Sequence, residues 1–376
     1  MSYLDDLTPP HRALLTRYVT SYQRCAEITD PRLLALPHPK RVLIGDVGQH
    51  EMAFLEAVAP DYIQQIKTGN LSLDMGIGML VHDYPDLVRG LFQNSREILD
   101  ALVLRTLLYY HQVSIFQTTD ALESMLQATD LGDDLPASLF QTPFRNIFIQ
   151  FGETTPFPIT LHDPSSGDHT IEGCYVFSGE IGTITDPERS VRGFRIMLFG
   201  SPSGKSCLYD DTFAHIAVPI HDETLPIGDI IQYAVDKFLA ANLNVRNAHA
   251  YAEVGKHVAK VLLYMGLKDA RQAVRNDASE AVRRLAAIKS TAKRVKAQRQ
   301  MDRLYDRIVV GPVSSPIHRA PGTGHRTLHA HLRRGHFRMQ PYGPKQALRR
   351  PQWIAPTLVG GTQSDCLPAR PYIVRA

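Results

Sequence analysis

Hydrophobic residues recur at helical spacing over most of the first 130 residues. Between His11 and Ile28 they lie three or four positions apart, which places them on one face of an α-helix. The same spacing begins after Asn94 or Ser95, and again near Asp120, where Glu123 three residues later resembles a capping box. This part of the chain is therefore predicted to be mainly helical.

The pattern changes near Asp133, where short runs of aromatic and β-branched residues alternate with Gly, Pro, Asp and Ser. The runs are Asn146–Phe151, Gly173–Phe177, Gly193–Phe199 and Thr212–Ile220. Short runs of this composition, separated by turn residues, predict an antiparallel sheet of about four strands.

Helical spacing returns over Pro226–Leu239 and over Ala248–Gly266, whose last residue is a suitable helix stop. The following segment, Asp269–Asp306, is rich in Lys and Arg and carries only a thin apolar stripe. We predict one long basic helix there, docked along one side and otherwise solvated or in contact with anions.

The C-terminal part is predicted to hold two strands, Thr327–Gln340 and Gln352–Val359, around the turn Pro341–Pro344. The fold class expected is α+β, with a helical N-terminal part, a central antiparallel sheet, a long basic helical region and a small β-rich C-terminal module. We expect an acidic α+β domain at 1–250 (helices in 1–130, strands at about 146–220, a helix at 226–239), a basic helical segment at 251–310, a linker at 311–324 and a basic module at 325–376.

Charge is distributed unevenly, although the whole chain carries only +3 from 41 Lys and Arg and 38 Asp and Glu. Residues 1–250 hold 17 basic and 31 acidic residues, a net charge of −14, whereas residues 251–376 hold 24 and 7, a net charge of +17. A basic tail on an acidic front indicates nucleic-acid binding by the tail, or pairing of the two halves across an interface.

Several common catalytic, nucleotide-binding and metal-binding motifs are absent from the sequence. The four cysteines form no CxxC pair, and no GxSxG occurs. Gly200–Ser206 (GSPSGKS) is one residue short of a P-loop and is predicted to be a hairpin loop, while His50-Glu51 lacks the second histidine of HExxH. No cofactor or metal is expected. The N-terminus shows no secretory signal and no span is apolar enough for a membrane helix, so we expect a cytoplasmic protein without a membrane partner.

The tail is crowded with histidine and arginine. His325, His329, His331 and His336 fall within twelve residues, but no Cys or carboxylate lies nearby to complete a metal site. Two of these histidines, with arginine beside them, would also suit acid–base cleavage of RNA. The sequence does not decide whether two of them face one phosphate.

Arginine for phosphates and aromatic rings for bases is the usual combination in proteins that bind RNA or single strands. The alternative is a small β-module in which Arg338 stacks on Trp353. The residues we expect to contact RNA or the ribosome are His331, Arg333, Arg334, Gly335, His336, Phe337, Arg338, Tyr342, Arg350 and Trp353.

The run His331–Phe337 (HLRRGHF), with a Tyr-Gly turn and then Arg350–Pro356 (RPQWIAP), resembles the tail of a type V-A anti-CRISPR family found with phages, plasmids and other mobile elements. The tail in that family looks like H-[IL]-R-R-G-H-aromatic, then a basic strand ending in a W-x-x-P-like element. A weaker likeness covers Leu135–Phe140 and the strand after it. The order of the predicted elements is also similar.

This resemblance implies CRISPR inhibition through loss of the messenger of the type V-A effector nuclease. The family is thought to recognise the nascent N-terminal peptide of the nuclease at the ribosome, and recognition leads to translation-dependent loss of the mRNA. By this reading the partners are the nascent polypeptide, held by the acidic front, and the mRNA or translating ribosome, met by the basic tail. The peptide-binding residues are not assigned. The protein would be an adaptor or, as an enzyme, a ribonuclease.

Two other functions stay open on the residues alone. One is an RNA-binding protein or ribonuclease toxin of a mobile element that acts through the His/Arg tail. The other is a plasmid maintenance factor that binds DNA through the basic helix.

Overall fold

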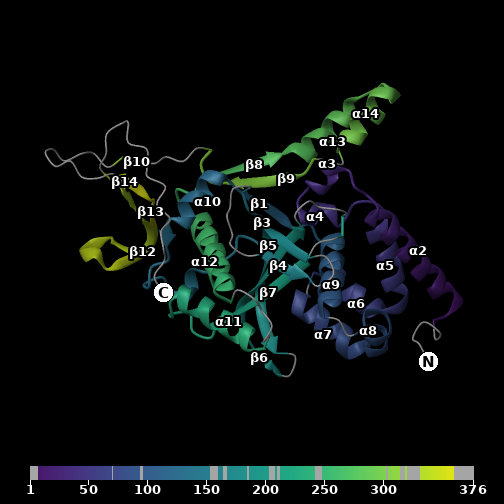
Figure 1. Ribbon diagram of the computed structural model, residues 1–376, viewed down its shortest axis with the longest axis horizontal. Helices are drawn as coiled ribbons and strands as arrows, with labels where there is room; N and C mark the ends of the chain where they lie inside the picture. The colour runs from purple at the N-terminus through teal and green to yellow at the C-terminus, as the bar shows by residue number, and fades with distance from the viewer. Residues whose placement is uncertain are drawn as a thin grey trace.

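An eight-stranded mixed sheet forms the centre of the molecule, and helices cover both of its faces (Figure 1). The computed structural model describes residues 7–69, 71–93, 96–152, 160–163, 167–183, 186–202, 208–209, 212–241, 248–301, 304–313, 318–319 and 331–359. The predicted α+β class with a helical N-terminal part is confirmed.

The N-terminal helices form one layer. They are α2 (Pro9–Ala26), α3 (Pro31–Leu34), α4 (His38–Arg41), α5 (Val47–Val58), α6 (Pro60–Lys67), α7 (Leu73–Asp83), α8 (Pro85–Phe92) and α9 (Arg96–Tyr110). Many begin with proline, whose fixed φ suits the first turn, and the Thr8 side chain caps α2 by accepting from the His11 N–H. The predicted helices over His11–Ile28 and after Asn94–Ser95 correspond to α2 and α9.

The sheet strands are β1 (Ser114–Thr118), β3 (Asn146–Gln150), β4 (Thr160–Asp163), β5 (Gly167–Thr183), β6 (Asp186–Pro202), β7 (Thr212–Pro219), β8 (Gln272–Asn276) and β9 (Asp306–Val310). Their order is β7-β6-β5-β3-β1-β9-β8, with β4 also paired to β5. The predicted strands correspond to β3, β5, β6 and β7, which pair antiparallel as expected.

The sheet is larger than the four antiparallel strands predicted and is mixed, because β1 pairs parallel with both β3 and β9. Helix α10 (Asp120–Gln127) lies in the chain between β1 and β3, and such a crossover is what a parallel pair requires. The predicted capping box at its start is also wrong. Thr119 caps the helix, whereas the buried Glu123 contacts Thr118 and lies 2.7 Å from His257 Nε2.

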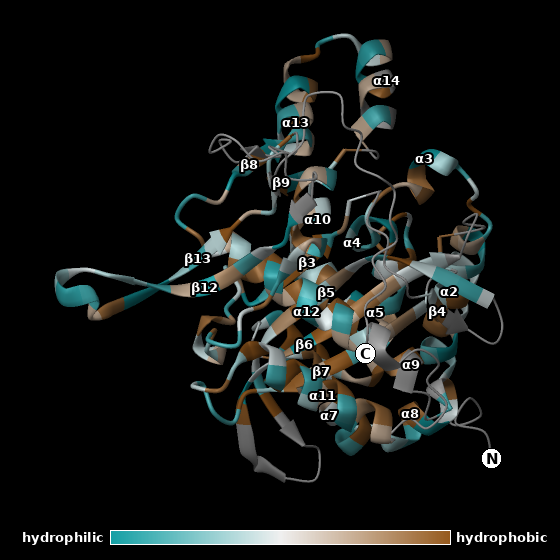
Figure 2. Cartoon of the chain, turned by 60° about the vertical axis from the view of Figure 1, so that its left-hand side comes forward, coloured by the Kyte–Doolittle hydropathy of each residue, from teal (hydrophilic) through white to brown (hydrophobic). Residues whose placement is uncertain are grey.

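Residues on each strand alternate between two hydrophobic cores. On β3, Ile147 and Ile149 face a core shared with α10, α11 (Ile227–Ala241) and α12 (Ala248–Met265), while Phe148 faces the core of the N-terminal helices. Side chains of a strand point to opposite faces in turn, so burying both faces requires apolar residues at consecutive positions. Figure 2 shows the resulting concentration of hydrophobic residues in the strands.

The long helix predicted over Asp269–Asp306 is instead a strand, two helices and a strand: β8, α13 (Asp277–Ala287), α14 (Thr291–Met301) and β9. The carboxylate of Asp306 on β9 accepts from the backbone N–H groups of Ala278 and Ser279, at 2.9 and 3.1 Å, which fixes the start of α13. Burial acts to raise the pKa of Asp306, but the Ser279 and Ala278 hydrogen bonds outweigh it and lower that pKa overall. We call residues 268–301 the basic arm.

The C-terminal strands form two small sheets. One contains β10 (His318–Arg319), β14 (Thr357–Val359) and β11 (His331–Arg333); the other contains β13 (Leu348–Ile354), β12 (Gly335–Tyr342) and β2 (Thr129–Asp130). Of the predicted linker 311–324, only residues 311–313 and 318–319 belong to the described part. Among the described helices, none is long and apolar enough to span a membrane.

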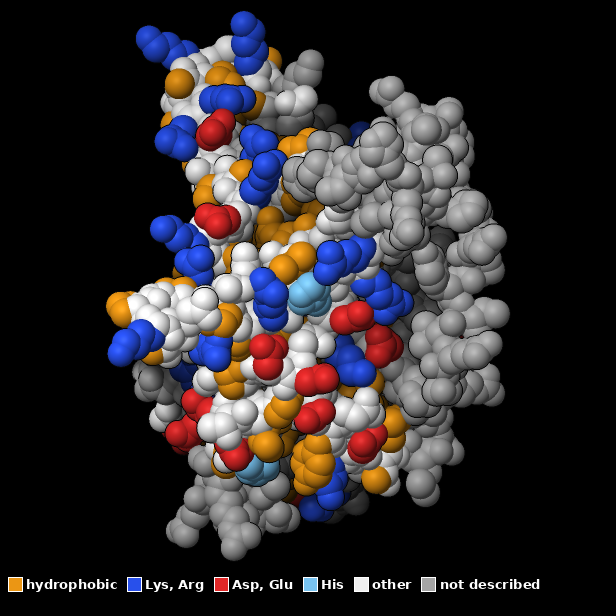
Figure 3. Space-filling view, turned by 90° about the vertical axis from the view of Figure 1, so that its left-hand side faces the viewer, with side chains coloured by type: hydrophobic (Ala, Val, Ile, Leu, Met, Phe, Trp, Pro, Cys, Tyr) orange, Lys and Arg blue, Asp and Glu red, His pale blue; other side chains and the backbone are white. Residues whose placement is uncertain are grey.

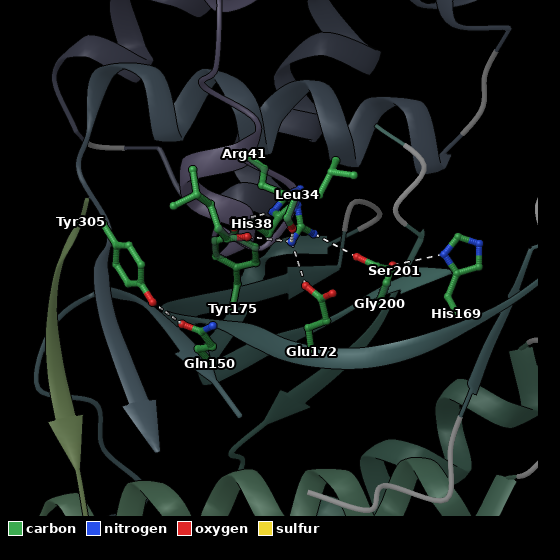
Figure 4. A network of polar contacts seen from close by, with 11 residues as sticks. Leu34, His38, Arg41, Gln150, His169, Glu172, Tyr175, Gly200, Ser201 and Tyr305 are labelled. Atoms are coloured by element: carbon green, nitrogen blue, oxygen red, sulfur yellow. Dashed lines mark hydrogen bonds and ion pairs between the residues drawn. The ribbon is translucent and has the colours of Figure 1, made fainter. Parts of the chain in front are cut away.

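Arg41 joins the N-terminal helices to the sheet (Figure 4). Its side chain is 1% exposed and donates to Glu172 Oε2 at 2.9 Å, to Ser201 Oγ at 3.1 Å and to the Leu36 carbonyl at 2.8 Å. Next to it, His38 Nδ1 lies 2.7 Å from the Tyr175 hydroxyl. A buried guanidinium needs such a complete set of acceptors, so α4 has one position over the sheet.

We expect Arg41→Met to lower the free energy of unfolding by about 3–5 kcal/mol, because the carboxylate of Glu172 and the bonded carbonyls lose their donor in a largely dry site. Arg24→Met is the control. Its ion pair with Asp46, 2.7 Å long, is exposed and should contribute at most about 1 kcal/mol. Urea titrations of both variants check this, and equal losses would contradict it.

Candidate functional site

The motif residues from Gly335 to Trp353 lie on a projecting β-hairpin, whereas His331 and Arg333 belong to β11 in the other small sheet. Strands β12 and β13 pair antiparallel from His336–Ile354 to Tyr342–Leu348, and the ribbon extends away from the body of the molecule (Figure 2). The turn predicted at Pro341–Pro344 begins later than expected: Pro341 and Tyr342 still pair with Arg349 and Leu348. The chain reverses over residues 343–347, which include the short 3-10 turn Pro344–Gln346. Residues 333–350 contain six Lys and Arg and no carboxylate.

The base of the hairpin is held by β2, a segment some 200 residues earlier in the chain. Gly335 and His336 pair parallel with Thr129 and Asp130, and the Gly335 N–H donates to the Ala128 carbonyl at 2.8 Å. A Cβ on Gly335 would lie 2.6 Å from Thr129 Oγ1 and 2.7 Å from the Ile354 carbonyl oxygen. The glycine of the HLRRGHF motif is therefore required by close packing of two strands.

Phe337 and Trp353 fix the hairpin base to the core. Phe337 is fully buried, and its ring stacks on Trp353 across the strand pair with centroids 6.0 Å apart. The indole Nε1 donates to Thr129 Oγ1 at 3.2 Å, and Tyr264 meets the indole edge-on. Arg338 pairs with Gln352 and so faces the other side of the ribbon, which makes the predicted Arg338–Trp353 stack wrong.

Lys260 of α12 holds the β2 segment in place. Its ammonium donates to the carbonyls of Leu126 and Thr129, at 2.8 and 2.9 Å, inside the protein. Burial lowers the pKa of Lys260 to about 8, against the opposing effect of Glu253 and Asp130. The same Asp130 forms an exposed 2.9 Å ion pair with Arg334, a contact that adds little stability.

Beyond Met339 the hairpin stands free of the body. The Met339 N–H donates to Asp134 Oδ2 at 2.9 Å, and this is the outermost such contact described. An open groove of about 580 Å³ lies beside it, between Asp134 and Pro136 on one side and Arg338–Pro341 with Arg349 on the other. The cations past this point are free to meet a partner.

The hairpin tip combines cations with an aromatic face. Tyr342 is 40% exposed, and the Arg350 guanidinium lies 5.3 Å from its ring centroid. Lys345 and Gln346 have φ angles of 52° and 56°, in the left-handed region that non-glycine residues seldom occupy. Such local strain is often found at binding sites, and this tip offers charge for phosphates and a ring for an unpaired base.

The remaining predicted residues have different outcomes. Arg333, Arg334 and Arg338 are exposed, and His336 is half-buried near β2. His325 and His329 lie outside the described residues, as does the side chain of His331. Within the described part of the chain, no group of three or more His, Cys, Asp and Glu is placed to hold a metal ion.

Sequence reasoning missed the residues that hold the hairpin, namely Thr129, Lys260 and Tyr264. Thr129 and Tyr264 carry no local signal of this role. Lys260 does carry one, because it stands among Val258, Val261 and Leu262 in an otherwise apolar stretch of helix. A lysine at such a position needs buried acceptors.

We expect Gly335→Ala to lower the free energy of unfolding by about 1–3 kcal/mol, because the new methyl group overlaps Thr129 and Ile354 and separates β12 from β2. The control is Gly78→Ala in α7. A Cβ there meets nothing within 4 Å, so the helix should be unchanged or slightly more stable. Thermal unfolding and Trp353 fluorescence report both effects; an unshifted spectrum and midpoint in Gly335→Ala would contradict the packing argument.

We also expect the stability of the wild type relative to Lys260→Met to rise with pH above about 8. The folded protein loses the Lys260 proton there while the unfolded chain keeps it until about pH 10, so the cost of burying the charge disappears. The gain should be on the order of 1–3 kcal/mol between about pH 7 and 10. Urea titrations of both proteins in the same buffers give this difference, because the pH dependence contributed by all other titratable groups is the same in both and cancels. A difference that does not vary with pH would refute the assignment.

Comparison with known proteins places these features in a family. The model of the AcrVA2-like family, described as the anti-CRISPR type V subtype A2 family, matches residues 116–361. The match begins in β1 and includes the strands that follow it, the basic arm and the hairpin, whereas the N-terminal helices precede it. No curated protein matches the chain. Since the match spans well over half of the sequence, the chain belongs to the anti-CRISPR type V subtype A2 family.

Proposed function

We propose that this anti-CRISPR protein recognises the nascent N-terminal peptide of the type V-A effector nuclease and triggers translation-dependent loss of its mRNA. Its partners are then the emerging polypeptide and the mRNA or translating ribosome, in the cytoplasm. The protein acts as an adaptor that holds both.

The observation that carries the proposal is the separation of charge within one fold. The C-terminal hairpin and the two arginines just before it carry six cations between residues 333 and 350, and the basic arm carries ten Lys and Arg against three Asp and Glu. In Figure 3, Lys and Arg gather on the arm and around the hairpin, while Asp and Glu gather on the face below them. A ribosome and its message are polyanions, so they attract the first surfaces and repel the second.

The hairpin supports a docking role. The described cations of the hairpin are exposed to solvent. The base of the hairpin is fixed, because Phe337 is buried in the core and Lys260 holds β2. Guanidinium groups beside the Tyr342 ring supply phosphate contacts and a stacking surface. The family match includes this whole region, which agrees with a role in the shared function.

The decisive experiment separates the peptide from the nucleotide sequence. The first codons of the nuclease are fused to a neutral reporter in two recoded forms, one synonymous and one that encodes a different peptide. We expect the protein to deplete the reporter mRNA of the synonymous form, as it does the natural one, and to spare the form that encodes another peptide. Message levels with and without the protein provide the measurement.

Two controls accompany this test. A reporter whose start codon is removed should keep its mRNA, because no peptide is made. Equal depletion of both recoded forms would refute peptide recognition. Cleavage of naked reporter RNA by the purified protein would instead identify a ribonuclease, the alternative carried by the His/Arg tail.

A further inference from the structure

The basic arm projects from the edge of the sheet, well away from the hairpin tip. In Figure 1 α13 and α14 extend beyond the strands β8 and β9 that carry them. All five residues of β8 are exposed, and the described side chains of α13 and α14 include none that is buried. The least exposed side chains described there, such as Leu285, Ile288 and Ala297, are only half-buried.

The arm is nevertheless held in a defined direction at its base. Asp306 accepts from the first turn of α13, and Arg307 donates to Asp277 at 2.7 Å and to Gln117 of β1 at 2.8 Å. Through these contacts the arm is joined to the parallel strands β1 and β9. A projecting element with a fixed base can present its side chains to a large partner without first being ordered.

The exposed surface of the arm is strongly cationic. The sequence of the arm, residues 268–301, has a net charge of +7. Arg284 pairs with Glu280 at 3.0 Å, whereas Lys289, Lys293 and Arg294 are exposed and make no ion pair with any described residue. Lys293 and Arg294 lie in the first turn of α14, which holds no acidic residue and where the positive end of the helix dipole disfavours cations. This arrangement opposes helix formation in isolation and becomes favourable against a polyanion.

The composition of the arm indicates which polyanion. A helix that lies on a membrane needs large apolar side chains opposite its cations, but the exposed large hydrophobic residues described in this arm are all valines: Val274, Val282 and Val295. Double-helical RNA presents two rows of phosphates that can be bound without entering a groove. Each helix of the arm is about 16 Å long, which is enough to reach several phosphates.

We propose that the basic arm is a docking surface for the phosphate backbone of double-helical RNA, such as that exposed on a translating ribosome. The choice of RNA rests on the proposed function, while the need for a polyanion rests on the arm itself. The arm would be a second RNA contact in addition to the hairpin. It would recognise the shape and charge of the RNA duplex and not its base sequence.

The test compares the full-length protein with the triple variant Lys289→Gln, Lys293→Gln and Arg294→Gln. The control variant, Arg17→Gln, Arg89→Gln and Lys237→Gln, removes three exposed cations from α2, α8 and α11. The probe is an RNA duplex of about 20 base pairs, with the dissociation constant measured between about 50 and 200 mM salt. Thermal unfolding verifies that both variants fold.

We expect the arm variant to bind the duplex about tenfold or more weakly than wild type, with a salt slope smaller by about 2–3, while the control variant changes little. An unchanged slope in the arm variant would overturn the proposal. A DNA duplex bound as tightly as the RNA would overturn the assignment to RNA, and binding to vesicles of anionic lipid without binding to RNA would identify a membrane surface instead.

A second readout separates this inference from the proposed function. In cells, the arm variant should lose mRNA depletion, whereas the purified variant should still bind the N-terminal peptide of the nuclease. If peptide recoding has no effect but the RNA slope behaves as expected, the proposed function fails and the RNA surface stands. If recoding behaves as expected and the arm variant depletes mRNA fully, the role of the arm in this activity is refuted.

Discussion

Both faces of the central sheet must be kept from water, and the placement of the other elements follows from that constraint. Strands such as β3 carry apolar residues at consecutive positions, so one layer of helices cannot bury them. The N-terminal helices cover one face and α10, α11 and α12 the other. Arg41 completes the first layer because its guanidinium finds acceptors on α3, β5 and β6 at once only when α4 lies in one position.

The two basic surfaces are attached to this body at different points. The hairpin is held through β2, which α12 fixes by the Lys260 ammonium, so its support comes from the second helical layer. The arm continues from β8 and β9 at the sheet edge, where one strand has no neighbour beyond it in the described chain. Each basic surface is therefore fixed at its base and exposed to solvent at its far end. This arrangement suits contact with a partner that is much larger than the protein.

Much of the chain could be predicted from local pattern. The helices over α2, α9, α11 and α12 follow from hydrophobic spacing, and Gly266 ends α12 as expected. The strands β3, β5, β6 and β7 follow from composition and turn residues. The prediction of one helix over Asp269–Asp306 is wrong, although the charge and alanine content of this segment suit a helix throughout. Only pairing of β8 with β9, and of β9 with β1, makes its ends strands.

The candidate site shows the same division more sharply. The sequence alone determined the fold class, the charge asymmetry and the match to the family over residues 116–361, since these depend on residue type and order. Tertiary structure decided what each motif residue does. Phe337 is buried in the core, Gly335 allows β12 to pack closely against β2, and the ring of Tyr342 is exposed. The reason is physical: Gly335 and Trp353 contact Thr129, which is distant in sequence and is itself held by Lys260 of α12.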